Sequence, residues 1–213
     1  QEGLSTRGVS SPIEPRWFRL VCLSLVVMRC QPFRRALCSY LSMDEKVIIR
    51  KVTVEDAESV LSLMYQLDRE SKFMLLEPEE RTTTLEQQIQ IIHSFNDSSN
   101  KVMYLLTNDE KAFGFIVGVG NTANRNKHCM SLVIGLLQAV TGQGFGKELV
   151  NKLEGWAISH GYSRLELTVM QHNERAKRLY ESCGFEVEGL KRHSLVVDGE
   201  YVNELYMSKL LTA

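Results

Sequence analysis

Residues 129–157, CMSLVIGLLQAVTGQGFGKELVNKLEGWA, change their hydrophobic period across a short glycine-rich turn. The first part alternates apolar residues with others, which predicts a strand with one buried face: Met130, Leu132, Ile134 and Leu136. The last part has apolar residues at helical spacing: Leu149, Val150, Leu153 and Ala157. A strand, a glycine turn and a long amphipathic helix are therefore expected in this order.

Two nucleotide-binding motifs do not fit this turn. A phosphate-binding P-loop, GxxxxGK[ST], would need glycine where Thr141 stands and a hydroxyl where Glu148 stands. An acid at that position would repel phosphate. The dinucleotide fingerprint GxGxxG fails as well, because counting from Gly142 puts Lys147 at the last glycine position.

The remaining feature is a set of glycines at 142, 144 and 146 that leads directly into a helix. Glycines let backbone N–H groups approach an anion without a Cβ in the way. The helix N-terminus adds unpaired donors and partial positive charge, which suit a pyrophosphate, and Lys147 adds a full charge. A tight turn without a ligand remains the alternative.

A second helix is predicted over residues 173–182 and ends at Cys183-Gly184. Asn173, Ala176 and Tyr180 stand at i, i+3 and i+7, so they share one face of that helix. On such a face Asn173 could orient a ligand and the Tyr180 phenol could donate a proton. The alternative is an N-terminal capping Asn and a Tyr in the core.

The other segments predict an α/β (α+β) fold, a mixed sheet with helices on its faces. Thr53 and Asp56 resemble a capping box, and Asp198-Gly199 is a strong hairpin turn. The expected strands cover residues 47–51, 101–107, 112–120, 130–137, 165–169, 185–197 and 201–210, and the expected helices residues 53–69, about 85–95, about 145–160 and 173–182.

Composition changes abruptly at Met43. Residues 1–42 hold three of the five Cys, three of the four Pro and a net charge of +4, while residues 43–213 carry −5. We expect residues 1–42 to be a leader, an upstream region or an added segment outside the fold, and residues 43–213 to form one domain. The apolar run at residues 20–28 resembles a signal-peptide core but is too short to span a bilayer.

The overall net charge of −1 lacks the basic surplus of a nucleic-acid binder. The two cysteines of the body, Cys129 and Cys183, make no disulfide framework, so we expect a reduced, cytoplasmic protein. His128-Cys129 with the distant Cys183 and His193 lacks zinc spacing, and no metal site is expected.

Taken together, the two motifs resemble the GNAT superfamily of acetyl-CoA-dependent N-acetyltransferases. Its glycine-turn signature, [QR]-x-x-G-x-[GA], compares with T-G-Q-G-F-G at residues 141–146, where Thr141 replaces the usual Arg or Gln. Its second signature, N-x-x-A-x-x-x-Y-x-x-x-G-F, is matched in full by residues 173–185. The tail, residues 188–207, resembles the bacterial branch that includes ribosomal-protein and polyamine acetyltransferases. The resemblance covers about residues 47–211.

The resemblance implies about seven mostly antiparallel strands and a site in which the fourth and fifth strands splay apart. Acetyl-CoA would be the co-substrate, its pantetheine arm would lie in that gap, and Tyr180 would protonate the departing thiolate after direct attack by an amine. The implied cofactor-binding residues are Leu136, Leu137, Gln138, Thr141, Gly142, Gln143, Gly144, Phe145, Gly146, Lys147 and Asn173.

The amine must lose a proton before it attacks, so a base or a water chain is needed. The sequence offers Glu166, Glu204, His128 and His193 without choosing among them. The acceptor, a small-molecule or peptide amine, also stays open, as does a homodimer. Residues 43–213 are expected to bind neither nucleic acid nor membrane. The alternative function is an acyl-CoA sensor or regulatory domain with the same fold and no turnover.

Overall fold

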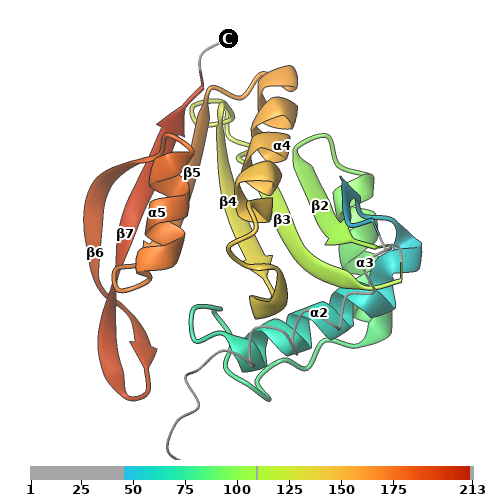
Figure 1. The fold of residues 1–213 in the computed structure, drawn as a ribbon. Coiled ribbons are helices and arrows are strands. Elements are labelled where there is room, and N and C mark those ends of the chain that lie inside the picture. The colour runs from blue at the N-terminus through green and yellow to red at the C-terminus, as the bar shows by residue number, and fades with distance from the viewer. Residues whose placement is uncertain (1–45, 109, 212–213) are drawn as a thin grey trace, which may run out of the picture. The chain divides into compact units, whose positions relative to one another are not determined.

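The computed structural model describes residues 46–108 and 110–211. The expected boundary at Met43 and the leader-like residues 1–42 lie outside the described residues. The elements follow the predicted order (Figure 1): β1 Ile48–Lys51, α2 Ala57–Glu70, α3 Leu85–Asn96, β2 Lys101–Thr107, β3 Ala112–Gly120, β4 Cys129–Leu136, α4 Phe145–Ser159, β5 Arg164–Met170, α5 Glu174–Ser182, β6 Glu186–Val197 and β7 Glu200–Leu210.

The seven strands form one sheet in the order β1-β2-β3-β4-β5-β7-β6. Every neighbouring pair is antiparallel except β4 and β5, which run parallel. The mixed, mostly antiparallel fold class is therefore confirmed. The parallel pair needs the long crossover that α4 supplies.

The ends of the helices show why these segments start and stop where they do. Two short 3-10 turns that the sequence did not predict, Val54–Asp56 and Gln138–Val140, precede α2 and follow β4. The Asp56 carboxylate accepts a hydrogen bond from the Thr53 backbone N–H (2.7 Å), as the predicted capping box requires, and a second one from the Thr53 hydroxyl (3.1 Å). Gly161 follows α4 at a φ of 80°, a conformation that glycine adopts without strain.

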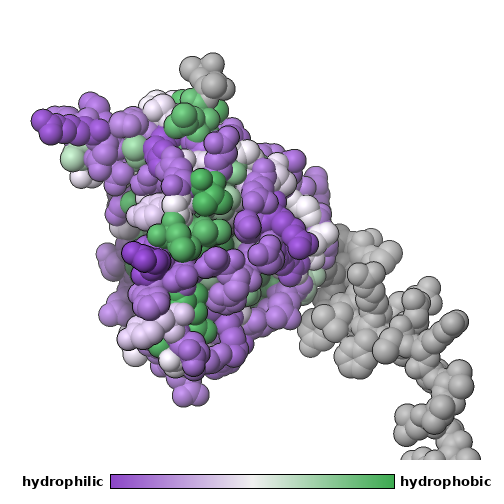
Figure 2. All heavy atoms as spheres, turned by 90° about the vertical axis from the view of Figure 1, so that its left-hand side faces the viewer, coloured by the Kyte–Doolittle hydropathy of each residue, from purple (hydrophilic) through white to green (hydrophobic). Residues whose placement is uncertain are grey.

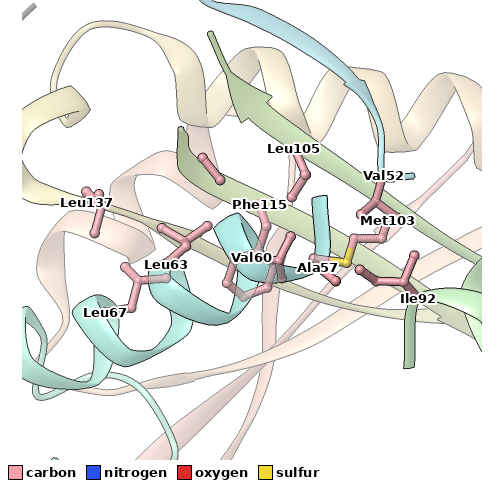
Figure 3. Close-up of a cluster of buried hydrophobic side chains, with 11 residues drawn as sticks. Val52, Ala57, Val60, Leu63, Leu67, Ile92, Met103, Leu105, Phe115 and Leu137 are labelled. Carbon is pink, nitrogen blue, oxygen red and sulfur yellow. The ribbon is translucent and has the colours of Figure 1, made fainter. Parts of the chain in front are cut away.

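Helices cover the two faces of the sheet unequally. α2 and α3 pack on one face of β2 and β3 through a buried cluster that includes Leu63, Ile92, Leu105 and Phe115 (Figure 3). α4 covers the opposite face, since a Cβ added at Gly118 would lie 2.7 Å from Leu153 of this helix. The first four strands thus form the inner layer of a three-layer core.

The last three strands are covered on one face only. In Figure 1, α5 lies in front of β5 and β7 and beside α4. The β5 side chains on the helix side are buried, as Leu165 (0% exposed) and Leu167 (4%) show. On the other face of β5, Thr168 is exposed. No helix of the described residues covers that face.

Candidate active site

The two parallel strands separate after a short stretch of pairing. β4 and β5 pair at Cys129–Arg164, Met130–Leu165 and Ser131–Glu166, and no further. Leu137 N–H donates to the Phe113 carbonyl of β3 (2.9 Å), so Ile134 and Leu136 turn their backbone groups toward the β5 side. The two strands therefore leave a gap beyond Ser131, the arrangement that the resemblance implied for a pantetheine arm.

Three elements meet at the wide end of this gap. A Cβ added at Gly146, in the first turn of α4, would lie 3.0 Å from Leu179 of α5 and 3.4 Å from Leu136 of β4. Only a residue without a side chain lets the N-terminus of α4 approach both neighbours this closely. The glycine turn is thus held directly beside the gap and beside α5.

The turn presents a row of unused backbone donors. The amides of residues 142–146 donate to no backbone or side-chain acceptor in the described part of the chain. Gly142 and Gly144 have φ of 79° and 94°, which keeps the loop in a left-handed conformation that glycine favours. Five consecutive free amides at a helix N-terminus form a site suited to a pyrophosphate.

Residues at the two ends of the turn, and the Gln143 side chain, already use their hydrogen-bond donors within the protein. The Thr141 hydroxyl and N–H both donate to the Gln138 carbonyl, at 2.6 and 3.2 Å. Lys147 N–H donates to the Gly144 carbonyl (3.0 Å), and the Gln143 side chain donates to the Ala139 carbonyl (2.9 Å). Lys147 could therefore contribute its side-chain charge to an anion site, but its amide is already used.

Arg175 is a cation at this turn that the sequence analysis did not include. Its Nη2 lies 3.8 Å from the position that a Cβ on Gly142 would take. The residue stands in the first turn of α5, two positions after Asn173, inside the second signature. A guanidinium binds phosphate oxygens through paired N–H groups, so Arg175 complements the free amides.

The backbone and the side chain of Gln138 are both hydrogen-bonded to Glu70 at the end of α2. Its backbone N–H donates to Glu70 Oε2 (3.0 Å), and its side-chain Nε2 donates to the Glu70 carbonyl (3.0 Å). With the Leu137 amide bonded to β3, Leu136 is the residue of the 136–138 segment that can still offer a backbone amide to the gap. No sequence motif could have identified Glu70, because its contact with Gln138 joins residues that are 68 positions apart.

Residues 70–73, called the strap below, bridge the wide end of the gap. Glu70 binds Gln138 at the end of β4, and the Phe73 ring lies 5.3 Å from the His172 ring just after β5. Lys72 Nζ reaches Asp198 Oδ2 in the β6–β7 turn at 2.6 Å. The strap thus joins three distant elements around the place where the strands open.

Asn173 and Tyr180 lie on α5 as predicted. Asn173 is the N-cap, and its Oδ1 accepts the Ala176 N–H (3.1 Å), while its Nδ2 has no partner among residues that the structure describes. Tyr180 is 5% exposed, and its ring packs at 5.7 Å against Phe185. Its hydroxyl forms no hydrogen bond within the described ranges, and burial raises the pKa of this phenol.

The four candidate bases are dispersed or occupied. Glu166 stands at the closed end of the gap, bound to Arg164 at 3.1 Å, on the face opposite the buried Leu165. Burial raises the pKa of Glu204, but hydrogen bonds from Thr168 (2.7 Å) and Lys191 (3.0 Å) outweigh this and lower it below its ordinary value.

His128 lies away from the wide end of the gap, whereas His193 lies near the β6–β7 hairpin, which extends past that end. His128 precedes β4 at the opposite end of the strand, and its carbonyl accepts the Ser163 N–H (3.1 Å). His193 stacks on Tyr201 (4.7 Å) near the β6–β7 hairpin. Burial raises the pKa of the Cys183 thiol, which does not favour a nucleophilic cysteine. No group of three or more His, Cys, Asp or Glu side chains in the described ranges could hold a metal ion.

The comparisons with known proteins identify the family and the fold. The acetyltransferase (GNAT) family model matches residues 61–185. An uncharacterized N-acetyltransferase of Bacillus subtilis, YdgE, is 28% identical over 102 residues, 47% of this chain and 65% of its own length.

Two solved structures share the fold. A GNAT-family acetyltransferase of Streptococcus pneumoniae has a TM-score of 0.75 at 24% identity, over 78% of this chain and 100% of its own. A GNAT-superfamily phosphinothricin acetyltransferase of Sinorhizobium meliloti, solved with acetyl-CoA, has a TM-score of 0.68 at 14% identity, over 78% and 88% of the two chains.

Proposed function

Because the chain belongs to the GNAT family of acetyltransferases, we propose that it transfers an acetyl group from acetyl-CoA to a primary amine by direct attack within a ternary complex. The observation that carries this proposal is the row of five free amides at residues 142–146. They stand beside Arg175 and the gap between β4 and β5. Such a row would bind the pyrophosphate of the thioester donor, which supplies the activated acetyl group.

The residues around the gap then have separate tasks. Leu136 offers a backbone amide to the pantetheine arm, and Asn173 Nδ2 offers a side-chain donor. The Tyr180 phenol is protonated at neutral pH, and burial raises its pKa further above the ordinary value. In this proposal Tyr180 is the acid that donates its proton to the thiolate as the bond between sulfur and the acetyl group breaks. Cys183 takes no part, so no covalent acetyl-enzyme forms.

The decisive experiment combines binding and turnover. Calorimetry with CoA measures the donor site, and thiol release in the presence of acetyl-CoA and a panel of amines measures transfer. Binding together with amine-dependent thiol release supports an enzyme. Binding without release for any amine would favour the acyl-CoA sensor, and absence of binding would contradict both functions.

Two further expectations belong to the same proposal. A single domain over residues 43–213 predicts that the chain without residues 1–42 melts at the same temperature. The buried free thiols of Cys129 and Cys183 suit a reducing cytoplasm. No helix of the described residues combines the length and apolarity needed to cross a membrane.

We propose a homodimer as the assembly, and the edge strand β6 is the feature that favours it. Figure 2 shows hydrophobic residues along this side of the molecule, and the exposed apolar side chains of β6 are Val187, Leu190 and Val196. Light scattering measures the mass in solution. A monomer at assay concentration would contradict the dimer and leave the catalytic proposal intact.

A further inference from the structure

We infer that the acceptor is a primary amine with an apolar carbon skeleton, selected by Val133 and Tyr206 on the uncovered face of the sheet. This inference rests on the proposed acetyl transfer and names the substrate class for that site. We call one side of β4, β5 and β7 the open face. It carries Ser131, Val133, Glu166, Thr168 and Tyr206.

The open face borders the gap directly. Met130 and Leu132 of β4 point to the α4 side and are 0% and 4% exposed, so the alternate residue Val133 points the other way and is 53% exposed. Across the gap, Thr168 of β5 pairs with Tyr206 of β7. These residues lie two positions beyond the last pair, Ser131–Glu166, where the strands have begun to separate.

Tyr180 stands on α5, on the helix-covered side of the sheet. α5 covers the face on which Leu165 and Leu167 are buried. An amine that attacks while Tyr180 protonates the leaving thiolate therefore has a free route from the open face. On that route it meets Val133 on one side of the gap and Tyr206 on the other.

Tyr206 is placed to receive an apolar group. It is 45% exposed, and its cross-strand neighbour on β6 is Gly189, which has no side chain. A Cβ added at Gly189 would meet nothing within 4 Å, so the space beside the ring is open. An aromatic ring with one free side offers contact area to an aliphatic or aromatic substituent.

The charged side chains on this face are largely paired with one another. Arg164 binds Glu166 (3.1 Å) and Glu188 (2.5 Å), and Lys191 binds Glu204 (3.0 Å). These three carboxylates are thus engaged, so the selection is assigned to the exposed apolar side chains of Val133 and Tyr206.

The test compares three amines with the full chain and acetyl-CoA: 2-phenylethylamine, ethanolamine and spermidine. We expect kcat/KM to be about two- to tenfold higher for 2-phenylethylamine than for either other amine, since an aromatic contact is worth about 0.5–1.5 kcal/mol. A preference for spermidine or ethanolamine would overturn the inference and leave acetyl transfer standing. Binding of CoA without turnover of any amine would overturn both.

Variants separate the named residues from general effects. Tyr206→Ser should remove the preference for 2-phenylethylamine through a higher KM for that amine. Tyr201→Ser is the matched control, because Tyr201 is 69% exposed on the same strand but lies at the hairpin end. Lys191→Gln frees Glu204 and should raise kcat/KM for spermidine several-fold. An unchanged preference in Tyr206→Ser would overturn the assignment.

Discussion

The first four strands and the last three differ in how they are packed, and this difference separates stability from chemistry. β2 and β3 are buried along most of their length between α2, α3 and α4. In β6 no residue is fully buried, and the buried residues of β7 are Glu204, Met207 and Ser208. The gap between β4 and β5 lies where the two regions meet. We therefore expect mutations in the first region to act on folding and mutations at the gap to act on turnover.

The largest expected effect is a core deletion in the first region. Leu105 of β2 is 0% exposed in the cluster between the sheet and α2. Leu105→Ala should lower the free energy of unfolding by about 2–5 kcal/mol. Leu190→Ala, the same change at a β6 residue that is 47% exposed, should cost much less. Denaturant unfolding of both variants measures the contrast, and equal losses would contradict it.

The second effect is catalytic. Tyr180→Phe keeps the ring against Phe185 and removes the proton, so kcat should fall by about 10²-fold, the low end for general acid catalysis, because water can partly replace the phenol. CoA affinity and melting temperature should stay close to those of the parent. A kcat within about twofold of the parent would assign Tyr180 to the core alone.

The pH profile sharpens the same point. Burial raises the pKa of Tyr180 above its ordinary value of 10.0, so the phenol stays protonated through the usual assay range. The parent should therefore lose no activity from this group up to about pH 10. An alkaline loss of kcat with a midpoint near 9 that disappears in Tyr180→Phe would contradict the raised pKa.

The third effect concerns the donor site, where a substitution at Gly144 tests the glycine turn. A Cβ at Gly144 would meet nothing within 4 Å of the protein, but the φ of 94° makes any side chain strained and a β-branched one more so. Gly144→Ala should cost about 1–2 kcal/mol of stability, and the methyl group should hinder an anion at the free amides.

A matched control stands at the other end of the same helix. Gly161, with a φ of 80° and equally open space, has the same strain away from the turn. Gly161→Ala should lose similar stability and keep its CoA affinity, whereas Gly144→Ala should weaken CoA binding about tenfold beyond it. Calorimetry decides, and equal affinities would place the pyrophosphate elsewhere.

Local patterns were enough to predict the elements, while the contacts around the gap were not predictable. The capping pair Thr53 and Asp56 and the turn Asp198-Gly199 act over a few residues, so the sequence displays them. The free amides also follow from glycine spacing before a helix. By contrast, Glu70 meets Gln138 only after α2 has packed across the sheet.

The direction of the side chains was the second feature that the sequence could not predict. The alternation of β5 indicated that Glu166 and Leu165 point to opposite faces, but not which face has a helix above it. That depends on the crossover through α4, a non-local property. Arg175 had a usable signal, since it stands in the first turn of the helix that carries the second signature, but its distance to Gly142 required the folded chain.

The smallest expected effect is a pH-dependent one in the second region. Hydrogen bonds from Arg164 and Ser208 lower the pKa of Glu188 from 4.5 to about 2. A depressed carboxyl pKa stabilises the fold above the unfolded value, and this contribution is lost as pH falls from about 4.5 toward 2. Because the Glu188 side chain is 45% exposed and its pair is screened by solvent, the contribution should be small.

Glu188→Gln should therefore melt slightly below the parent at pH 7, and the difference should vanish near pH 2. Salt at 1 M should shrink the pH 7 difference as well, since the Debye length is then only about 3 Å. Glu186→Gln on the same strand removes a carboxylate that has no ion pair among the described residues, so it controls for net charge. If both variants melted alike at every pH, the ion pair between Arg164 and Glu188 of β6 would contribute nothing to stability. The stability of the second region would then depend on the packing of α5 alone.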